Sequence, residues 1–421
     1  MVFVTCRPLT HNDPVSATAA VVSPRRGWRS WALLAALASM PLTACGTLTG
    51  SDGATASASP DSVAAPLPGS AAQLSVTPAA GAADVRPDTP IQVSVTDGSL
   101  SRVSAVLADG TPVDGQLSAD GSTWNSAAGR LPYGAQVLVR AEAVDTAGWG
   151  KVTESRFSTL QPTDLVTTSI SPIRGSTVGV GMPVIVRLSA KPGDRAAVEE
   201  SLTVSSRPAV EGSWSWVGSR ELHWRPREYW PAGTDVNVAV DLTGKDLGDG
   251  VWGDETREVD FSVGAARVHT VDIAAHTMTV TENGKVLRVI PVTTGEDDKW
   301  PTREGIKVIM TKERTRVMDS DTVDIPEDSP DGYNLEVDYA MRLTNSGEFI
   351  HAAPWSVDSQ GNANVSHGCT GMSDENAAWL FSNTRVGDVV RYVNGRRGME
   401  PGNGWTDWNV SWANWVAKSA L

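Results

Sequence analysis

The chain has 421 residues, 40% of them hydrophobic and 20% charged, with a formal net charge of −14. The length suffices for about three domains, and the composition is that of ordinary globular proteins, which excludes a polytopic membrane protein and a wholly disordered chain. The acidic balance argues against nucleic acid as a partner, because phosphate binding needs a basic face.

Residues 1–45 have the pattern of a secretory signal. Arginines at positions 25, 26 and 29 precede an apolar run over residues 31–40, which is too short to cross a bilayer as a stable helix, and Leu42-Thr43-Ala44-Cys45 follows directly. This order is typical of a lipobox, in which the cysteine is acylated and becomes the first residue of the mature chain. An ordinary signal peptide and a start codon placed too far upstream are the alternatives. We expect lipidation of Cys45 and a protein held by this lipid at the outer face of the cell membrane, in the cell-wall space.

Residues 46–72 are rich in Ala, Ser, Pro and Gly and have no periodic apolar pattern, so we interpret them as a flexible linker with a reach of roughly 30 Å. After cleavage Cys369 is the one free thiol left, since Cys6 leaves with the signal and Cys45 carries the lipid. A lone thiol in an exported protein indicates chemistry. A buried, inert cysteine that packs as a small hydrophobe is the alternative.

Two repeats follow the linker, over residues 73–164 and 165–264. Val76-Thr77-Pro78 recurs as Ile170-Ser171-Pro172, an offset of 94 residues. Both repeats contain short alternating apolar runs separated by Gly, Pro and Asp turns, such as Ile91/Val93/Val95 and Val184/Val186/Leu188. Runs of strand period in units of about 100 residues predict two immunoglobulin-like β-sandwiches. In the second repeat, core or interface packing rather than sugar stacking is the interpretation for Trp214, Trp216, Trp224 and Trp230.

The β pattern continues through residues 265–395. Asn283-Gly284 separates two apolar runs and predicts a hairpin, because these residues suit left-handed turn positions. Residues 313–335 are polar and rich in Asp, Pro and Ser, which indicates a long loop of the kind that forms lids. Ser373 is expected to cap the N-terminus of a short helix.

Residues 396–421 contain four regularly spaced tryptophans. Trp405, Trp408, Trp412 and Trp415 are separated by three, four and three positions, which places them on one face of a helix. We expect a helical C-terminal extension that docks through its indoles onto the preceding domain, rather than a ligand cage.

The densest cluster of reactive side chains includes His351, His367 and Cys369. A nearby imidazole promotes the thiolate that acts as a nucleophile, and the N-terminus of the helix at Ser373 would favour the anion further. Backbone amides near Gly368 could hold an oxyanion, since glycine lets the backbone approach closely. A zinc site formed by the two histidines and the cysteine is the rival interpretation, disfavoured because no carboxylate or second cysteine stands at ligand spacing.

His351 together with Ser366-His367-Gly368-Cys369 resembles the signature of L,D-transpeptidases with a YkuD catalytic domain. The likeness extends to the lid, in Met318-Asp319-Ser320 and residues 329–333, and to the second repeat, in residues 211–216 and 229–234. With the lipobox and the Trp-rich tail it covers nearly the whole mature chain, and it is similar to the actinobacterial and mycobacterial lipoprotein members. The resemblance implies a mainly β protein, in which two immunoglobulin-like β-sandwich domains precede a YkuD-type β-rich catalytic domain with a short helix and a Trp-rich C-terminal helical extension.

The resemblance also implies a substrate and a reaction. Cys369 would attack the bond between the third residue of a peptidoglycan tetrapeptide stem, usually meso-diaminopimelate, and its terminal D-alanine. D-alanine would leave, a thioester would form, and the side-chain amine of a neighbouring stem would attack it to give a 3→3 cross-link. His351 would take the thiol proton, oriented by a backbone carbonyl near Ala352.

Further residues receive roles from the same resemblance. His367 would line the oxyanion side with the amides of Gly368 and Cys369. Tyr333 and Met318 would close over the acyl donor from the lid, and the substrate-contacting set is completed by Ala352 and Ser366. No metal or cofactor is needed, and carbapenems are the expected covalent inhibitors at the same cysteine.

Two alternatives to the cross-linking enzyme remain open. An L,D-carboxypeptidase would use water as the acceptor, and a non-catalytic cell-wall-binding lipoprotein would keep only the fold; the intact set of His351, His367 and Cys369 argues against the latter. The family usually continues after His-Gly-Cys with an apolar residue and Asn, whereas this chain has Thr370 and Gly371. We expect this departure to affect substrate preference and rate rather than the thiol–imidazole pair.

Overall fold

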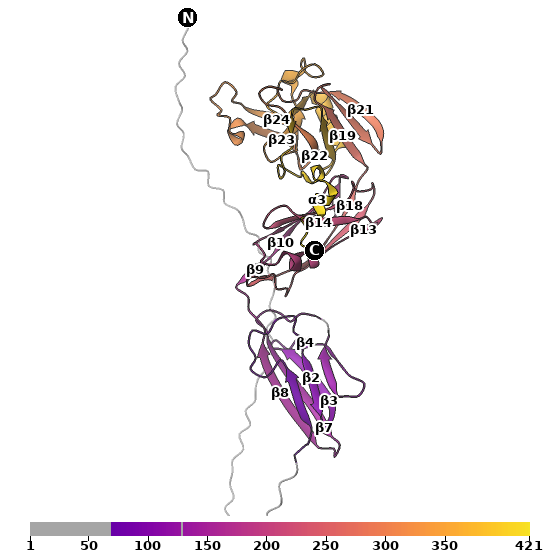
Figure 1. Cartoon of the computed structure of the whole chain (residues 1–421), viewed down its shortest axis with the longest axis vertical. Helices are drawn as coiled ribbons and strands as arrows, with labels where there is room; N and C mark the ends of the chain where they lie inside the picture. Colours follow the sequence, from indigo (N-terminus) through magenta and orange to yellow (C-terminus); the bar gives the residue numbers. More distant parts are fainter. Residues whose placement is uncertain (1–68, 128) are drawn as a thin grey trace, which may run out of the picture. The chain divides into compact units, whose positions relative to one another are not determined.

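The computed structural model describes residues 69–127 and 129–421. The predicted signal, the lipidation site at Cys45 and the predicted linker as far as residue 68 lie outside the described residues. Within the two described ranges, none of the helices combines the length and the apolar character needed to cross a membrane. The described chain consists mainly of β-strands, with few and short helices (Figure 1).

The first repeat forms two four-stranded antiparallel sheets. The predicted run Ile91/Val93/Val95 is buried between them, because alternate residues of a strand face the same side. One sheet has the order β1 (Gln73–Thr77), β2 (Gln92–Thr96), β6 (Thr123–Ser126), β5 (Gly115–Leu117), and the other β4 (Pro112–Val113), β3 (Gly98–Leu107), β7 (Gln136–Asp145), β8 (Gly150–Ser158).

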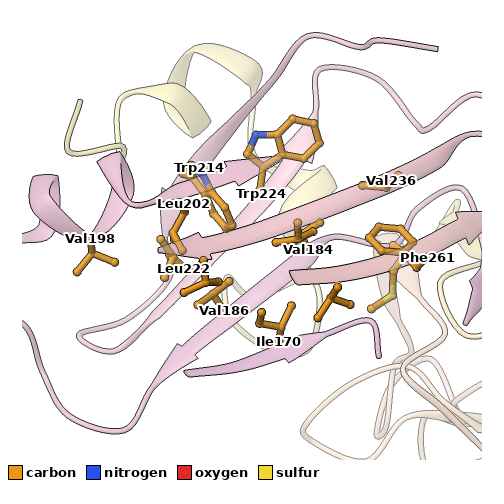
Figure 2. Packing of buried hydrophobic residues seen from close by; sticks show 14 of the residues in the cluster. Ile170, Val184, Val186, Val198, Leu202, Trp214, Leu222, Trp224, Val236 and Phe261 are labelled. Atoms are coloured by element: carbon orange, nitrogen blue, oxygen red, sulfur yellow. The ribbon is translucent and has the colours of Figure 1, made fainter. Parts of the chain in front are cut away.

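The second repeat also forms two four-stranded sheets around one core. Val184, Val186 and Leu222 from one sheet lie with Val236 and Phe261 from the other (Figure 2). One sheet has the order β10 (Thr168–Ser171), β12 (Val184–Leu188), β15 (Glu221–Pro226), β14 (Gly212–Trp216), and the other β11 (Thr177–Val178), β18 (Thr256–Val263), β16 (Asp235–Asp241), β13 (Leu202–Arg207). Helix α1 (Arg195–Glu200) and a parallel pair, β9 (Asp164–Val166) with β17 (Val251–Gly253), complete the repeat. All four predicted core tryptophans are buried, which confirms the packing interpretation.

One packing contact recurs at matching places in the two repeats. A Cβ atom on Gly115 would lie 1.9 Å from Cζ2 of Trp124, and one on Gly212 would lie 2.0 Å from Cζ2 of Trp224. In each repeat the glycine lies on the strand next to that of the tryptophan, so the indole covers the glycine backbone directly. This shared contact supports the internal repeat found in the sequence.

Replacing Gly212 with alanine is expected to lower the free energy of unfolding by about 1–3 kcal/mol, because the added methyl group overlaps a buried indole that cannot retreat. Gly218→Ala is the matched control in the same repeat, since an added Cβ there has nothing within 4 Å. Urea titration of both variants measures the difference. Equal midpoints would contradict the packing argument.

Residues 267–398 contain a six-stranded and a four-stranded sheet. Asn283 and Gly284 adopt positive φ angles of 50° and 78°, which confirms the predicted hairpin between β20 and β21. The larger sheet has the order β21 (Lys285–Pro291), β20 (Thr277–Glu282), β19 (Arg267–Asp272), β27 (Val389–Val393), β22 (Arg303–Val308), β28 (Arg397–Gly398). The smaller has the order β23 (Thr311–Asp319), β24 (Asn334–Arg342), β25 (Phe349–Ala352), β26 (Thr370–Met372).

The predicted long loop over residues 313–335 is partly regular. β23 continues to Asp319 and pairs with β24, and the short 3-10 helix η1 (Ser320–Val323) follows β23. A second short 3-10 helix, η2 (Pro354–Ser356), comes later in the chain, after β25. Only residues 324–333 lack helix and strand, and we call residues 319–333 the lid. The β23–β24 ribbon leaves most side chains of β23 partly or fully exposed, and its polar sequence therefore suggested a loop.

Ser373 begins the helix predicted there. Its side chain accepts the N–H of Asn376 at 3.3 Å, and α2 runs over Asp374–Asn383. Ala377 and Leu380 form its buried face, which packs into the core between the two sheets.

The Trp-rich tail differs from the expected single helix. It contains the 3-10 helix η3 (Asp407–Asn409) and the short helix α3 (Trp412–Val416), with Val410 between them in an extended conformation. The prediction that it docks on the preceding catalytic domain is incomplete. Asn409 does bind the backbone of Ile306, but Trp415 donates its Nε1–H to Ser213 O at 2.9 Å, on β14 of the second sandwich.

A single arginine lies against three of the tail's four indoles. The guanidinium of Arg225, on β15, lies 4.7, 5.3 and 4.8 Å from the ring centroids of Trp408, Trp412 and Trp415. Next to it His223 bonds to Asp407 of the tail and to Glu221, at 2.9 and 2.7 Å. Burial alone would lower the pKa of His223, but the two carboxylates outweigh burial and raise it to about 9. The tail is therefore joined to the second sandwich by cation–π contacts and a buried ion pair.

Candidate active site

Two short parallel strands bring the predicted catalytic segments together. β25 carries His351, β26 begins directly after Cys369, and their register pairs His351 with Gly371. On the other side, bridges join Thr293 to Gly371 and Gly295 to Ser366. We call residues 366–369, which carry the thiol, the cysteine loop. Pairing on both sides thus fixes this loop beside β25, the strand of His351.

A cavity of about 290 Å³ opens at this place. Six predicted site residues line it, from the end of β23, the lid, β25 and the cysteine loop: Met318, Tyr333, His351, Ser366, His367 and Cys369. Thr293, Trp355, Ser356 and Gly371 are part of the remaining wall. The cavity can take a substrate segment between the lid and the thiol.

Cys369 is partly buried and packs against a small apolar cluster that includes Phe349 and Met318. Its Sγ–H donates to the backbone carbonyl of Gly347 at 3.5 Å. Burial raises the pKa of the thiol to about 11, against a smaller opposing effect of the Phe349 backbone N–H. Burial thus disfavours the thiolate form of Cys369. This effect opposes the imidazole and the N-terminus of α2, which were expected to favour the thiolate, and the strand β26 lies between Cys369 and the helix in the chain.

His351 is buried on β25 with a defined tautomer. Its Nδ1–H donates to Ala352 O at 2.7 Å, so Nε2 carries the lone pair, and its ring stacks on Trp355 with centroids 6.0 Å apart. Burial lowers the pKa of His351. A neutral imidazole with a free Nε2 can accept a proton. Among the described residues no hydrogen bond joins it to Cys369, although both line the cavity.

His367 lies between two aromatic rings. Its ring centroid is 5.4 Å from that of Trp300 and 5.0 Å from that of the lid residue Tyr333. Burial lowers the pKa of His367, Asp331 opposes this effect, and Lys299 adds to it. Lys299 also forms an ion pair with Asp331 of the lid at 2.5 Å. The lid is thereby held over the cysteine loop.

The backbone N–H of Gly368 was expected to be available to an oxyanion, but in the structure it already has a partner. This N–H donates to Ser366 Oγ at 3.1 Å, and the same hydroxyl donates to Cys369 O at 2.6 Å. Ser366 therefore closes the turn that presents the thiol. The Gly368 amide becomes available only if this hydroxyl moves.

Ala352 is not placed as predicted for a substrate contact. Its side chain is buried and does not line the catalytic cavity, whereas its carbonyl orients His351. The role expected for a carbonyl near Ala352 thus agrees with the geometry, and the role expected for its side chain does not.

Thr370 and Gly371 have structural reasons for their identity. Thr370 is buried and its hydroxyl lies 2.7 Å from the Tyr392 hydroxyl. A Cβ on Gly371 would lie 2.9 Å from Cβ of Ala353 and 3.1 Å from Cγ2 of Thr293. A larger residue at 371 would require these neighbours to move.

Three polar residues behind the cysteine loop were missed by the sequence analysis. Thr302 donates its hydroxyl to Gly368 O at 2.8 Å, and Lys307 pairs with Glu348 at 2.5 Å. Lys307 lies between Ile306 and Val308, and no role was predicted for it. An isolated charge within each of two apolar segments, 305–310 and 347–352, was the available signal.

The rival zinc interpretation is not supported by the positions of the side chains. Within residues 69–127 and 129–421, one group of three possible ligands has its atoms within 4.8 Å of one another, and it consists of Asp319, Asp321 and Glu327 in the lid. His351, His367 and Cys369 are not gathered at that spacing.

Comparison with known proteins identifies two family models in the chain. Residues 82–246 match a bacterial Ig domain (Big_10), and residues 266–391 match the L,D-transpeptidase catalytic domain (YkuD). L,D-transpeptidase 2 of Mycobacterium tuberculosis (strain CDC 1551 / Oshkosh) is 38% identical over 341 residues, which cover 81% of this chain and 83% of that protein. L,D-transpeptidase 5 of M. tuberculosis (strain ATCC 25618 / H37Rv) is 35% identical over 364 residues, covering 84% and 78%.

A solved structure, LdtMt1 in complex with imipenem, is 43% identical with a TM-score of 0.48, covering 55% of this chain and all of that one. The family matches confirm the expectation of an immunoglobulin-like region followed by a YkuD catalytic domain.

Proposed function

The chain belongs to the L,D-transpeptidases with a YkuD catalytic domain, and from this premise we propose that it forms 3→3 cross-links between peptidoglycan stems through a thioester on Cys369. One observation carries the proposal. The thiol, a neutral imidazole with a free Nε2 and the lid residue Tyr333 line one cavity. This set provides a nucleophile, a proton acceptor and a cover for the acyl donor.

Acylation begins from a neutral pair. The thiol leaves its hydrogen bond with Gly347 O, gives its proton to Nε2 of His351 and attacks the carbonyl of the third stem residue. The tetrahedral intermediate collapses to the thioester, and the proton on His351 passes to the departing amine of D-alanine. Proton transfer thus accompanies attack, because the buried site disfavours a resting thiolate.

Deacylation reverses the proton path. The side-chain amine of a second stem attacks the thioester carbonyl and gives a proton to His351, and the thiolate that leaves takes this proton back. Only a neutral amine can attack, so His351 must again hold a free Nε2. The Nδ1 bond to Ala352 O keeps the ring in this tautomer throughout.

The test is mass spectrometry of residues 46–421 incubated with purified disaccharide-tetrapeptide, with Cys369→Ala as the inactive control. We expect a dimer that lacks one D-alanine, made by the wild type alone. Release of D-alanine without a dimer would replace the proposal by L,D-carboxypeptidase action. An unchanged substrate would overturn both.

Carbapenems are proposed to acylate the same sulfur. A β-lactam carbonyl offers the thiol an activated acyl group, and ring opening expels no fragment. We expect the mass of the chain to rise by the full mass of one inhibitor, and Cys369→Ala to show no rise.

We also propose that the protein is anchored outside the cell membrane by lipid on Cys45, on the basis of Leu42-Thr43-Ala44-Cys45 and the preceding apolar run. Cys45→Ala is expected to move the protein from the membrane fraction to the soluble fraction. The catalytic residues are distant in sequence, so carbapenem labelling should be unchanged. A variant that stays in the membrane fraction would contradict the anchor.

A further inference from the structure

Strand β22 and the residue before it lie behind the cysteine loop, and three of their residues make polar contacts there, one with the loop itself and two with Glu348. Just before the strand, Thr302 donates to Gly368 O at 2.8 Å. The Arg303 backbone N–H and guanidinium donate to Glu348 Oε1 at 3.1 and 3.0 Å, and Lys307 Nζ donates to Glu348 Oε2 at 2.5 Å. The catalytic domain therefore has a second layer of polar groups directly beneath its reactive layer.

Lys307 is the deepest group of this layer. Its side chain is fully buried, and its ammonium lies between the Glu348 carboxylate and the Tyr392 ring, 3.8 Å from the ring centroid. Each of these two partners holds one of the segments that enclose Cys369. Glu348 directly follows Gly347, whose carbonyl accepts the thiol, and the Tyr392 hydroxyl bonds to Thr370, which directly follows the cysteine.

Glu348 is fixed by backbone contacts as well. Its N–H donates to Thr344 Oγ1 at 2.9 Å, and its carbonyl accepts from Leu343 N at 2.9 Å. A Cβ on Gly368 would lie 3.7 Å from Glu348 Cγ, so this carboxylate runs alongside the cysteine loop. A displacement of Glu348 would therefore shift both the acceptor of the thiol and the loop that carries it.

We infer that Lys307 and Glu348 form a positioning pair for the nucleophile: together they fix Gly347 O and Thr370 around Cys369, and they set the electrostatic field in which the sulfur becomes an anion. The inference rests on the proposed role of Cys369 as the nucleophile. Neither residue touches substrate, since neither lines the catalytic cavity.

A contribution to stability does not by itself explain the buried ion pair between Lys307 and Glu348. Desolvation of two buried charges often costs as much as their attraction returns, so an apolar pair of similar volume would serve a purely structural role as well. The groups that face the sulfur come from several elements. The charged ones are Glu348, Lys307 and Arg342, and the neutral titratable ones are Tyr333, Tyr392, His351 and His367.

The two members of the pair act on the thiol with opposite signs. Lys307 lowers the pKa of Cys369 and Glu348 raises it. Removing a charged neighbour of this kind is expected to shift the pKa of the thiol by roughly one unit. A rise of one unit slows alkylation at fixed pH about threefold, because the thiolate fraction falls tenfold while the nucleophilicity of the anion rises by about a factor of three.

The experiment uses residues 46–421, in which Cys369 is the single cysteine. Iodoacetamide alkylation is followed by mass spectrometry between pH 7 and 9 for the wild type, Lys307→Met and Glu348→Gln. We expect Lys307→Met to react about threefold more slowly and Glu348→Gln about threefold faster. Both should transpeptidate more slowly than the wild type, Lys307→Met by more than tenfold, because it also loses the contacts to Glu348 and Tyr392.

Arg267→Met is the matched control, because it breaks another partly buried ion pair of the same domain, Arg267–Glu282 at 2.7 Å. It should lower stability without changing the alkylation rate. If Lys307→Met does not fold, the isosteric Glu348→Gln decides: faster alkylation supports the inference, and an unchanged or slower rate overturns it. Equal rates in all variants of an active enzyme overturn this inference alone, whereas an inactive wild type overturns the proposed function.

Discussion

Cys369→Ser is expected to lose transpeptidation and carbapenem acylation by more than about a thousandfold, although it differs from the wild type by one atom. The site already disfavours an anion, since burial raises the pKa of the thiol to about 11. A hydroxyl has a much higher pKa than a thiol and is a weaker nucleophile. Burial also lowers the pKa of His351, which makes it a weaker base toward this hydroxyl.

The serine variant keeps the geometry of the loop. Its hydroxyl can donate to Gly347 O as the thiol does, and Ser366 and Thr302 still hold the neighbouring carbonyls. The melting temperature should therefore stay close to that of the wild type. Time courses with a carbapenem, read as intact mass, measure the loss. A serine variant that retains a tenth of the wild-type rate would show that another group supplies the nucleophile.

His351→Gln is expected to slow acylation by about a hundredfold to ten-thousandfold, the usual contribution of a general base. Glutamine can donate its amide N–H to Ala352 O in place of Nδ1, so the loss should reflect proton transfer rather than folding. His276→Asn is the matched control: His276 bonds to Asn364 outside the catalytic cavity, and its φ of 56° suits asparagine. The control should keep its activity within about twofold.

The wild type and His351→Gln should differ in how their rates depend on pH. Below the lowered pKa of His351 the imidazole is protonated and cannot accept a proton, so the wild-type rate rises with pH until this group is neutral and then levels off. Without the base the variant depends on the thiolate alone, and its rate keeps rising toward the thiol pKa of about 11. The ratio of the two rates should therefore shrink as pH rises. A constant ratio from pH 6 to 9 would contradict a role of His351 in proton transfer.

Most of the architecture could be predicted from the sequence, because the patterns that indicate it are local. The offset between Pro78 and Pro172 and the alternating runs predicted two sandwiches, and Asn283-Gly284 placed a hairpin. The spacing between His351 and Cys369 predicted a shared site, and both line one cavity. These signals depend on backbone preferences and strand period, which a single sequence displays.

What the sequence did not reveal depends on contacts between distant segments. Lys307 lies among apolar residues at the end of β22, and the carboxylate of Glu348, in the segment just before β25 of the other sheet, makes its burial possible. The Gly368 amide was expected to be free, but the hydroxyl of Ser366 takes it. The spacing of the tail tryptophans fixes their common face, but not the identity of Arg225 as the group they surround.

The docking of the tail makes the second sandwich a discontinuous folding unit. Its strand β10 is made long before helix α3, which covers β14 and the side chain of Arg225. Contacts between such distant segments carry a high loop-closure cost and form late. During synthesis this surface stays open to water until the whole catalytic domain has emerged, and a chain cut short before Trp412 never closes it. Residues 408–415 therefore complete this surface only after the catalytic domain has been made, since their indoles cover the Arg225 guanidinium.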